Sequence, residues 1–386
     1  MIPLSTPNLR GNNLSYLKTC IRTQWVSSAG KYVNFFEKRI SKYTGSKYAI
    51  SCTSGTAALH LALRIIGVRE DDEVIVPTMT FIATANSVKY LKASPIFMDC
   101  DEFYNLDVRK TISFIKNKTF LKNNYSYNKK TKKRIFALLV VHVYGNAVDM
   151  SSLMTICKKR NIKIVEDAAG ALGTYYLKGK LKNKHAGTVS DVGCLSFNGN
   201  KIITSGGGGM ILTDDKKLAQ KAKYLSTQAM DDPIRYIHND IGYNYRLTNI
   251  QAAIGLAQLE KIKFFLKRKN IIYNFYKKAF KKITDINFAK KPNYAKNNKW
   301  MLSIEIDEKK RKLKKNALIR FLFKNRIETR STWLPIHKQR KYLNCETYKI
   351  TNATKLYRKS LNIPSGTNLS LKQAGQVVKT IKKFMK

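Results

Sequence analysis

One lysine lies between two glycine-containing loops in the stretch "LSFNGNKIITSGGGGMI", residues 195–211. A lysine in a tight and partly dry loop loses its proton more easily than a surface lysine. A neutral amine is the form that condenses with an aldehyde to give a Schiff base. Lys201 is therefore the first candidate for a catalytic residue.

A second candidate group stands in "IKIVEDAAGALG", where an apolar strand ends in Glu166 and Asp167. Ligands of open α/β sheets bind at the carboxyl ends of the strands. A carboxylate at such an end can pair with a cationic ring nitrogen. It can equally cap the helix that follows, and the stretch alone does not decide between these roles.

The third group is "TSGTAA", in which Ser54, Gly55 and Thr56 follow a strand and open a helix. The free N–H groups of a helix start, together with two hydroxyls, can bind a phosphate, although Ser and Thr also serve as ordinary helix caps. Phosphate anchor, ring-nitrogen partner and loop lysine together match the needs of pyridoxal phosphate. The glycine run has no GxGxxG followed by a helix, which argues against a dinucleotide loop.

The elements that position these groups alternate between strands and helices from about residue 45 to 215, which predicts an α/β domain around a largely parallel sheet. Residues 249–282 predict one long amphipathic helix with Asn249 as its N-cap. Residues 114–134 are expected to form a polar surface excursion. Strand "MLSIEID" and helices "RKLKKNALIRFLFKNR" and "LSLKQAGQVVKTIKKFM" predict a smaller α+β domain. The division is 1–250 for the large domain and 251–386 for the linking helix and small domain.

The charge of the 386-residue chain is unusual, because Lys and Arg minus Asp and Glu gives 72 − 25 = +47. Either the chain binds nucleic acid or another polyanion, or the lysines reflect a bias spread over the whole sequence. The spread of lysines with Asn, Ile and Tyr favours the second explanation. The six cysteines form no CxxC pair, so no metal site is predicted. No apolar run suits a membrane span and no secretory signal is present, so a cytoplasmic protein is expected.

Longer motifs carry a family resemblance. The stretches "WVSSAGKYVNFFEKRISKYTGSKYAI", "PTMTFIATAN", "EDAAGALG", "SFNGNKIITSGGGG", "GYNYRLTNIQAAIGLAQLE" and "WLPIH" span nearly the whole chain. They resemble the DegT/StrS sugar-nucleotide aminotransferases of pyridoxal phosphate fold type I. The sequences of these motifs are most similar to those of members that make 4-amino-4,6-dideoxy sugars in bacillosamine-type and legionaminic-acid-type pathways. One departure is Gly170, where many relatives carry Gln, His or Glu, and where water or another side chain could fill the space.

The resemblance implies a role for each matching residue. Lys201 would form the Schiff base with the cofactor and move the proton, and Asp167 would pair with the ring nitrogen. Phe81 would stack on the ring, and Asn244 would reach the phosphate from a partner subunit, which makes the working unit a homodimer. The phosphate would be held by Ser54, Gly55, Thr56 and Ser196.

The resemblance also implies transamination of a nucleotide-linked 4-keto-6-deoxy sugar with L-glutamate as donor, in the synthesis of surface-glycan precursors. A 3-keto sugar acceptor, or a polyanion-binding protein with an idle site, are the alternatives. The candidate substrate contacts are Trp25, Ser27, Ser28, Arg246, Arg330 and His337. Each also has a structural alternative, in which the tryptophan packs in the core, the arginines form structural ion pairs and the histidine is a structural group.

Overall fold

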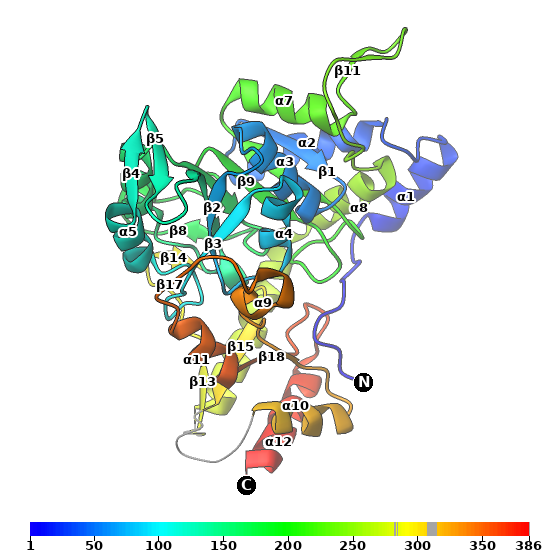
Figure 1. Ribbon diagram of the computed structural model, residues 1–386. Coiled ribbons are helices and arrows are strands. Elements are labelled where there is room, and N and C mark those ends of the chain that lie inside the picture. The colour runs from blue at the N-terminus through cyan, green and yellow to red at the C-terminus, as the bar shows by residue number, and fades with distance from the viewer. Residues whose placement is uncertain (282, 284, 307–314, 386) are drawn as a thin grey trace.

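A ten-stranded mixed sheet forms the centre of the computed structural model, which describes residues 1–281, 283, 285–306 and 315–385 (Figure 1). Strands β9, β7, β6, β2, β3 and β17 run parallel, whereas β10 is antiparallel to both β1 and β9. The predicted mostly parallel sheet is confirmed. In order across the sheet the strands are β1 (Tyr48–Cys52), β10 (Gly209–Thr213), β9 (Val192–Ser196), β7 (Lys163–Asp167), β6 (Arg134–Val141), β2 (Glu73–Pro77), β3 (Ser94–Met98) and β17 (Thr347–Tyr348).

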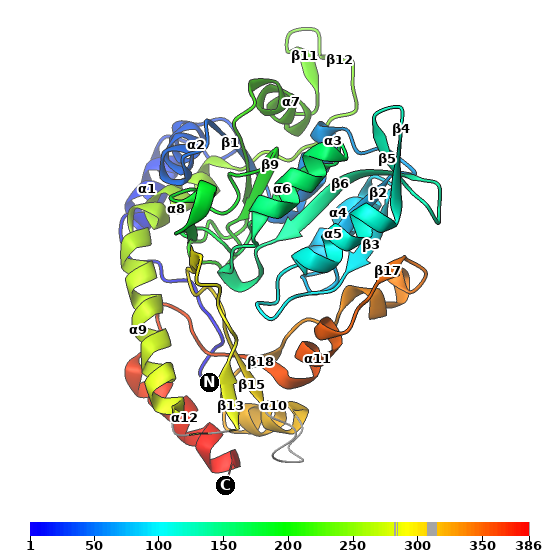
Figure 2. The same cartoon turned by 90° about the vertical axis from the view of Figure 1, so that its left-hand side faces the viewer.

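Helices cover this sheet and bury its apolar strands. All residues of β2 and β10 are buried, as continuous apolar runs in the centre of an α/β sheet require. Helix α3 packs against α4 and α7, α5 packs against α6, and α8 packs against α1 and α2 (Figure 2). Their bounds are α1 (Asn13–Arg22), α2 (Lys31–Thr44), α3 (Gly55–Ile66), α4 (Ala83–Tyr90), α5 (Val108–Asn117), α6 (Met150–Lys159), α7 (Lys216–Ser226) and α8 (Asn249–Glu260).

A smaller antiparallel sheet with its own apolar cluster lies at the other end of the molecule, and α9 runs between the two parts (Figure 2). The amphipathic helices α9 and α12 pack against each other beside this sheet. The strands, in order, are β13 (Ile286–Phe288), β15 (Leu302–Ile306), β18 (Ser360–Ile363) and β16 (Arg330–Ser331). The helices are α9 (Ile262–Phe280), α10 (Lys315–Lys324), α11 (Asn352–Lys359) and α12 (Leu371–Met385).

Segments cross the predicted boundary at residue 250 in both directions. Strand β17 joins the large sheet beside β3, and Trp300 packs in the large apolar cluster. Ile2 belongs to the small cluster and forms a bridge with Ile327. The division at 250 stays a prediction.

Three local predictions differ from the structure. The expected helix over 249–282 is two helices, α8 and α9, because the backbone turns at Lys261, whose N–H bonds to the carbonyl of Gln258. The N-cap of α8 is Thr248, which forms a capping box with Gln251. The expected surface excursion over 114–134 includes a hairpin, β4 (Thr119–Lys122) and β5 (Tyr125–Asn128), that extends the large sheet from β6. Residues 311–314 of the helix predicted in the small domain, and residue 307 of the predicted strand before it, lie outside the described residues.

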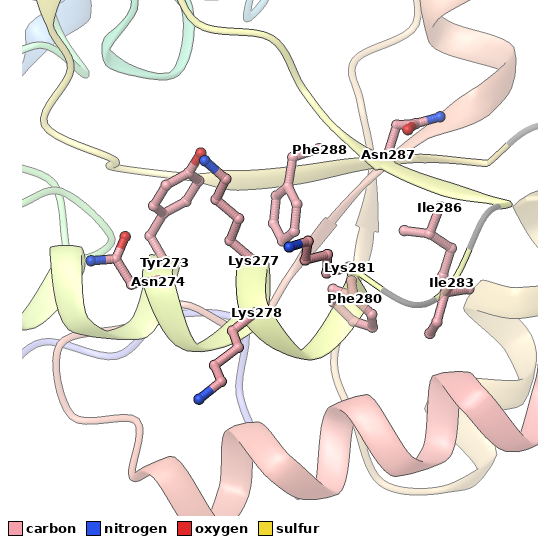
Figure 3. Close-up of a pocket in the computed structure, with 10 residues that line it drawn as sticks. All are labelled: Tyr273, Asn274, Lys277, Lys278, Phe280, Lys281, Ile283, Ile286, Asn287 and Phe288. Carbon is pink, nitrogen blue, oxygen red and sulfur yellow. The ribbon is translucent and has the colours of Figure 1, made fainter.

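An open cavity of about 810 Å³ lies between the end of α9 and β13 (Figure 3). Its walls combine apolar side chains such as Phe280 and Phe288 with Lys277, Lys278 and Lys281. None of the predicted site residues lines it. Over the described part of the chain, no helix has the length and apolar character needed to cross a membrane.

Candidate active site

The ends of two parallel strands bring the predicted carboxylate and lysine to one edge of the sheet. Asp167 is the last residue of β7 and stands in register with Cys194 of β9. Lys201 lies in the loop that follows β9. Since parallel strands end at a common edge, the two side chains share the edge at which α/β proteins bind ligands.

The carboxylate of Asp167 is buried and only partly satisfied by hydrogen bonds. Its Oδ2 accepts from the hydroxyl of Thr84 at 2.9 Å, and its Oδ1 accepts from the N–H of Ala169 at 3.1 Å. Burial raises the pKa of Asp167, while these two donors and the charge of Lys201 favour its ionised form. A buried carboxylate of this kind is suited to a cationic partner such as a protonated ring nitrogen.

The neighbouring Glu166 is fully engaged by the protein. Its two oxygens accept from the N–H groups of residues 187, 189 and 190, from the Ser190 hydroxyl and from His142 Nε2 at 2.9 Å. His142 Nδ1 accepts from the N–H of Val148, so the ring proton resides on Nε2 and points at Glu166. Glu166 is therefore a structural group. Of these two adjacent carboxylates, Asp167 accepts fewer hydrogen bonds and is the one able to interact with a ligand.

The side chain of Lys201 provides the amine that the sequence predicts. Burial lowers the pKa of Lys201 to about 8, and the negative charge of Asp167 opposes this shift. The residue as a whole keeps some exposed surface, whereas its amine is buried. Lys201 and Asp167 influence each other's pKa through their charges. Each group can still interact with a ligand.

The predicted phosphate site is the first turn of α3. Ser54 is the N-cap, and its hydroxyl accepts from the N–H of Ala57. Gly55 and Thr56 occupy the first two helical positions, where N–H groups have no acceptor within the helix and the helix dipole favours an anion. Ser196 lies directly against this turn, because a Cβ on Gly55 would stand 2.8 Å from the Ser196 Cβ. Free amides, hydroxyls, a dry amine and a buried carboxylate fit pyridoxal phosphate.

Aromatic rings form a row beside the edge of the sheet. Phe81 is 56% exposed, and its ring lies 6.4 Å from that of Trp333. Trp333 in turn lies 5.0 Å from Tyr144, which lies 6.4 Å from Trp300. The sequence predicts Phe81 as a cofactor-stacking residue, and its exposed face is open to a ligand. Trp300 was not singled out by any local motif.

The predicted sugar-pocket loop is held by a residue of α8. Asn249 donates its side-chain amide to the carbonyl of Trp25 at 2.6 Å and its backbone N–H to the carbonyl of Ser27 at 2.6 Å. The loop borders a cavity of about 480 Å³ that Trp25 and Asn249 help to line. Trp25 is 58% exposed, Ser27 is exposed and Ser28 is partly exposed. Trp25 is thus no core anchor, whereas Asn249 is a positioning residue that sequence reasoning took for a cap.

The remaining candidates lie in different surroundings. Asn244 and Arg246 are exposed in a segment whose Tyr245 carbonyl accepts from the N–H of Thr53, so the segment borders the turn before α3. Arg330 is exposed and forms an ion pair with Glu328 at 2.9 Å. His337 contacts the Thr78 hydroxyl through Nδ1 at 2.7 Å. The backbone between Asn244 and Arg246 thus borders the turn before α3, whereas Arg330 and His337 have protein partners.

Residues 7–382 match the DegT/DnrJ/EryC1/StrS aminotransferase family. The chain belongs to this family. Over 99% of its length it is 37% identical to GDP-perosamine synthase of Escherichia coli O157:H7, of which the match covers 98%. It is 29% identical, over 99% of its length and 96% of the relative, to a UDP-4-amino-4,6-dideoxy-N-acetyl-beta-L-altrosamine transaminase of Campylobacter jejuni.

A solved structure of a DegT/DnrJ/EryC1/StrS aminotransferase from Brucella abortus superposes with a TM-score of 0.86 at 25% identity, covering 97% of this chain and 95% of the other. The DegT aminotransferase is therefore a pyridoxal-phosphate-dependent enzyme, as its sequence predicts. The residues described above are those that would hold the cofactor: α3 and Ser196 at the phosphate, Asp167 at the ring nitrogen, and Lys201 at the aldehyde.

Proposed function

We propose that this DegT aminotransferase transfers the amino group of L-glutamate to the keto carbon of a nucleotide-linked 4-keto-6-deoxyhexose, as a cytoplasmic step in making a surface-glycan precursor. The observation that carries the proposal is the placement of the Lys201 amine and the Asp167 carboxylate at one edge of the sheet, beside the first turn of α3. The Campylobacter relative is named for a 4-amino-4,6-dideoxy sugar, and the Escherichia coli relative for a GDP sugar. GDP is accordingly the first nucleotide to test.

Bound pyridoxal phosphate supplies an electron sink that lets a proton leave the carbon next to the amino nitrogen. Lys201, with a pKa of about 8, has a substantial neutral fraction near physiological pH and can accept that proton and return it. Asp167 stabilises positive charge on the ring nitrogen. The first turn of α3 fixes the phosphate, so that the reacting carbon stays within reach of one amine.

The test is release of 2-oxoglutarate from L-glutamate in the presence of GDP-, UDP- and dTDP-linked 4-keto-6-deoxy sugars, with a 3-keto sugar nucleotide as comparison. We expect the 4-keto sugars to support turnover and GDP to give the highest kcat/KM. Turnover with the 3-keto sugar alone would overturn the assignment of the acceptor. No turnover with any sugar by a protein that binds pyridoxal phosphate would overturn the proposed function.

We also propose that the active enzyme is a homodimer with shared sites. An arm formed by β11 (Met230–Asp232), β12 (Ile237–His238) and the residues around them projects from the large domain (Figure 1). Ile234, Tyr236 and Ile241 on it are 88%, 72% and 78% exposed. Exposed apolar side chains on a projecting arm favour contact with a second copy. Asn244 follows directly along the chain and is exposed, as a residue that reaches a neighbouring site must be.

A complementation experiment tests the shared site. Lys201→Ala and Asn244→Ala are each expected to be strongly impaired. Subunits of the two variants are mixed in equal amounts under conditions that allow exchange. Half of the dimers are then hybrids with one intact site, so activity should return to about a quarter of the wild-type level. No recovery, although light scattering shows exchanged dimers, would contradict the role of Asn244 in the partner's site.

A further inference from the structure

Gly170 stands three residues after Asp167 and carries no side chain. A Cβ at this position would lie 2.2 Å from Cε3 and 2.5 Å from Cζ3 of Trp300. The backbone of Gly170 does not adopt the left-handed conformation that favours glycine. The turn itself would therefore accept a larger residue. It is the indole ring of Trp300 that leaves room for glycine only.

The same ring lies against the catalytic loop. The Nζ of Lys201 stands 3.7 Å from the centre of the Trp300 ring. The Nε1–H of Trp300 donates to the carbonyl of Asn200, the residue before Lys201, at 2.7 Å. Trp300 itself is 6% exposed. One side chain thus fills the space beside Gly170, covers the amine of Lys201 and fixes the backbone next to it.

Two further residues, Asn298 and Lys269, hold the backbone of this tryptophan by hydrogen bonds. Its N–H donates to Asn298 Oδ1, and the Asn298 side-chain amide donates to the carbonyls of Gly170 and Leu172. The buried amine of Lys269 donates to the carbonyls of Trp300 and Ser365, at 2.7 and 2.6 Å. These contacts connect α9 and the segment before β15 to the loops that follow β7 and β9.

We infer that Trp300 is a positioning residue for Lys201, and that its indole ring replaces the side chain missing at Gly170 and shields the amine from water. Two effects of the ring on the amine oppose each other. A ring face attracts the protonated amine, whereas exclusion of water favours the neutral amine. Burial lowers the pKa of Lys201 more than the charge of Asp167 raises it, and the ring supplies part of that burial. Removal of the ring should therefore raise the pKa of Lys201, because water enters the space.

The experiment measures the pKa of Lys201 in cofactor-free protein, from the pH dependence of its labelling by acetic anhydride, followed by peptide mass spectrometry. We expect about 8 in the wild type and a rise towards 10.5 in Trp300→Ala. Trp300→Phe keeps a ring face and should move the pKa much less. Leu266→Ala, which opens space beside Gly173 in the same loop, is the control and should leave the pKa unchanged. An unchanged pKa in folded Trp300→Ala overturns the inference.

A double-mutant cycle tests the link to Gly170. Gly170→Gln alone should weaken pyridoxal phosphate binding about tenfold or more, because two side chains compete for one space. In the Trp300→Ala background the same change should cost less, or should improve binding. Additive effects overturn the link. If Trp300→Ala does not fold, the cycle with Trp300→Leu takes its place.

The inference rests on the role proposed for Lys201, but its test needs no sugar substrate. A sugar assay without turnover, together with the expected shift in the Lys201 pKa, would reject the proposed function and leave the role of Trp300 standing. A working sugar assay with no shift would reject only the role of Trp300.

Discussion

Lys201→Ala is expected to lower kcat/KM for transamination at least about 10³-fold, because the variant loses the amine that we propose to form the cofactor bond and to move the proton. Lys201→Arg should lose as much. The guanidinium keeps the positive charge but stays protonated at any pH the protein tolerates, so it offers neither a nucleophile nor a base. Equal losses in both variants would show that a neutral amine is needed at residue 201, rather than a cation.

The measurement combines 2-oxoglutarate release with reduction of the loaded protein by borohydride. Reduction should attach the pyridoxyl phosphate group to Lys201 in the wild type and to no residue in the alanine variant. Lys182→Ala, which removes an exposed lysine, is the matched control and should behave as the wild type. Attachment of the group to a different lysine, or substantial turnover by Lys201→Arg, would show that the site has been assigned to the wrong amine.

Groups at the ends of regular elements were predictable, because local patterns fix them. Asp167 ends an apolar strand, and Ser54 precedes an amphipathic helix, so both places follow from the period of the apolar residues. The order of strand, helix and strand then puts the carboxylate and Lys201 at one edge of a parallel sheet. The candidate site came from these short signals before any long-range contact was known.

Contacts between distant segments were not predictable, because no local pattern encodes them. Thr84 donates to Asp167 across 83 residues of sequence, and nothing in "FIATAN" marks its hydroxyl as the one that turns towards β7. Trp300 meets Gly170 from a polar stretch before β15. The sequence shows that Gly170 lacks a side chain, but which residue fills the space beside it depends on how the small sheet packs against the large one.

Two element errors have simpler physical causes. Apolar periodicity continues through Lys261, so a pattern that counts only apolar residues cannot detect the turn between α8 and α9. The hairpin of β4 and β5 carries Phe120, Tyr125 and Tyr127, which favour strands, but the lysines around them suggested a loop. An edge hairpin needs only one buried face, so its polar residues were misleading.

Asp167→Asn is expected to lower kcat/KM about 10²- to 10³-fold while the protein still folds and binds the cofactor. The asparagine oxygen can still accept from Thr84 or Ala169, so the local packing is kept. What is lost is the negative charge facing the ring nitrogen. The cofactor then stabilises electrons less well, which slows the proton transfer rather than binding of the sugar. The loss should therefore appear in kcat more than in KM.

Asp167→Asn should also increase the neutral fraction of the Lys201 amine, although it lowers the activity. The charge of Asp167 raises the pKa of Lys201, so its removal should bring that pKa below about 8 in cofactor-free Asp167→Asn. A lower pKa means more neutral amine at pH 7, yet activity should fall. Labelling of Lys201 as a function of pH measures the shift. An unchanged lysine pKa would mean that the two groups are not electrostatically coupled, and full activity would mean that the ring nitrogen has another partner.

Glu166→Gln is the comparison for Asp167→Asn. It removes a negative charge from the protein core instead of the charge that faces the cofactor ring. Glu166 accepts from three backbone N–H groups, from Ser190 and from His142, so an amide in its place would turn a donor towards other donors. Leaving buried donors of this kind without an acceptor costs roughly 1–3 kcal/mol of unfolding free energy. Thermal unfolding should therefore show a large loss of stability for Glu166→Gln and a small one for Asp167→Asn, although the two carboxylates are adjacent in sequence. Similar stability losses in both would mean that Asp167 serves the fold rather than the reaction.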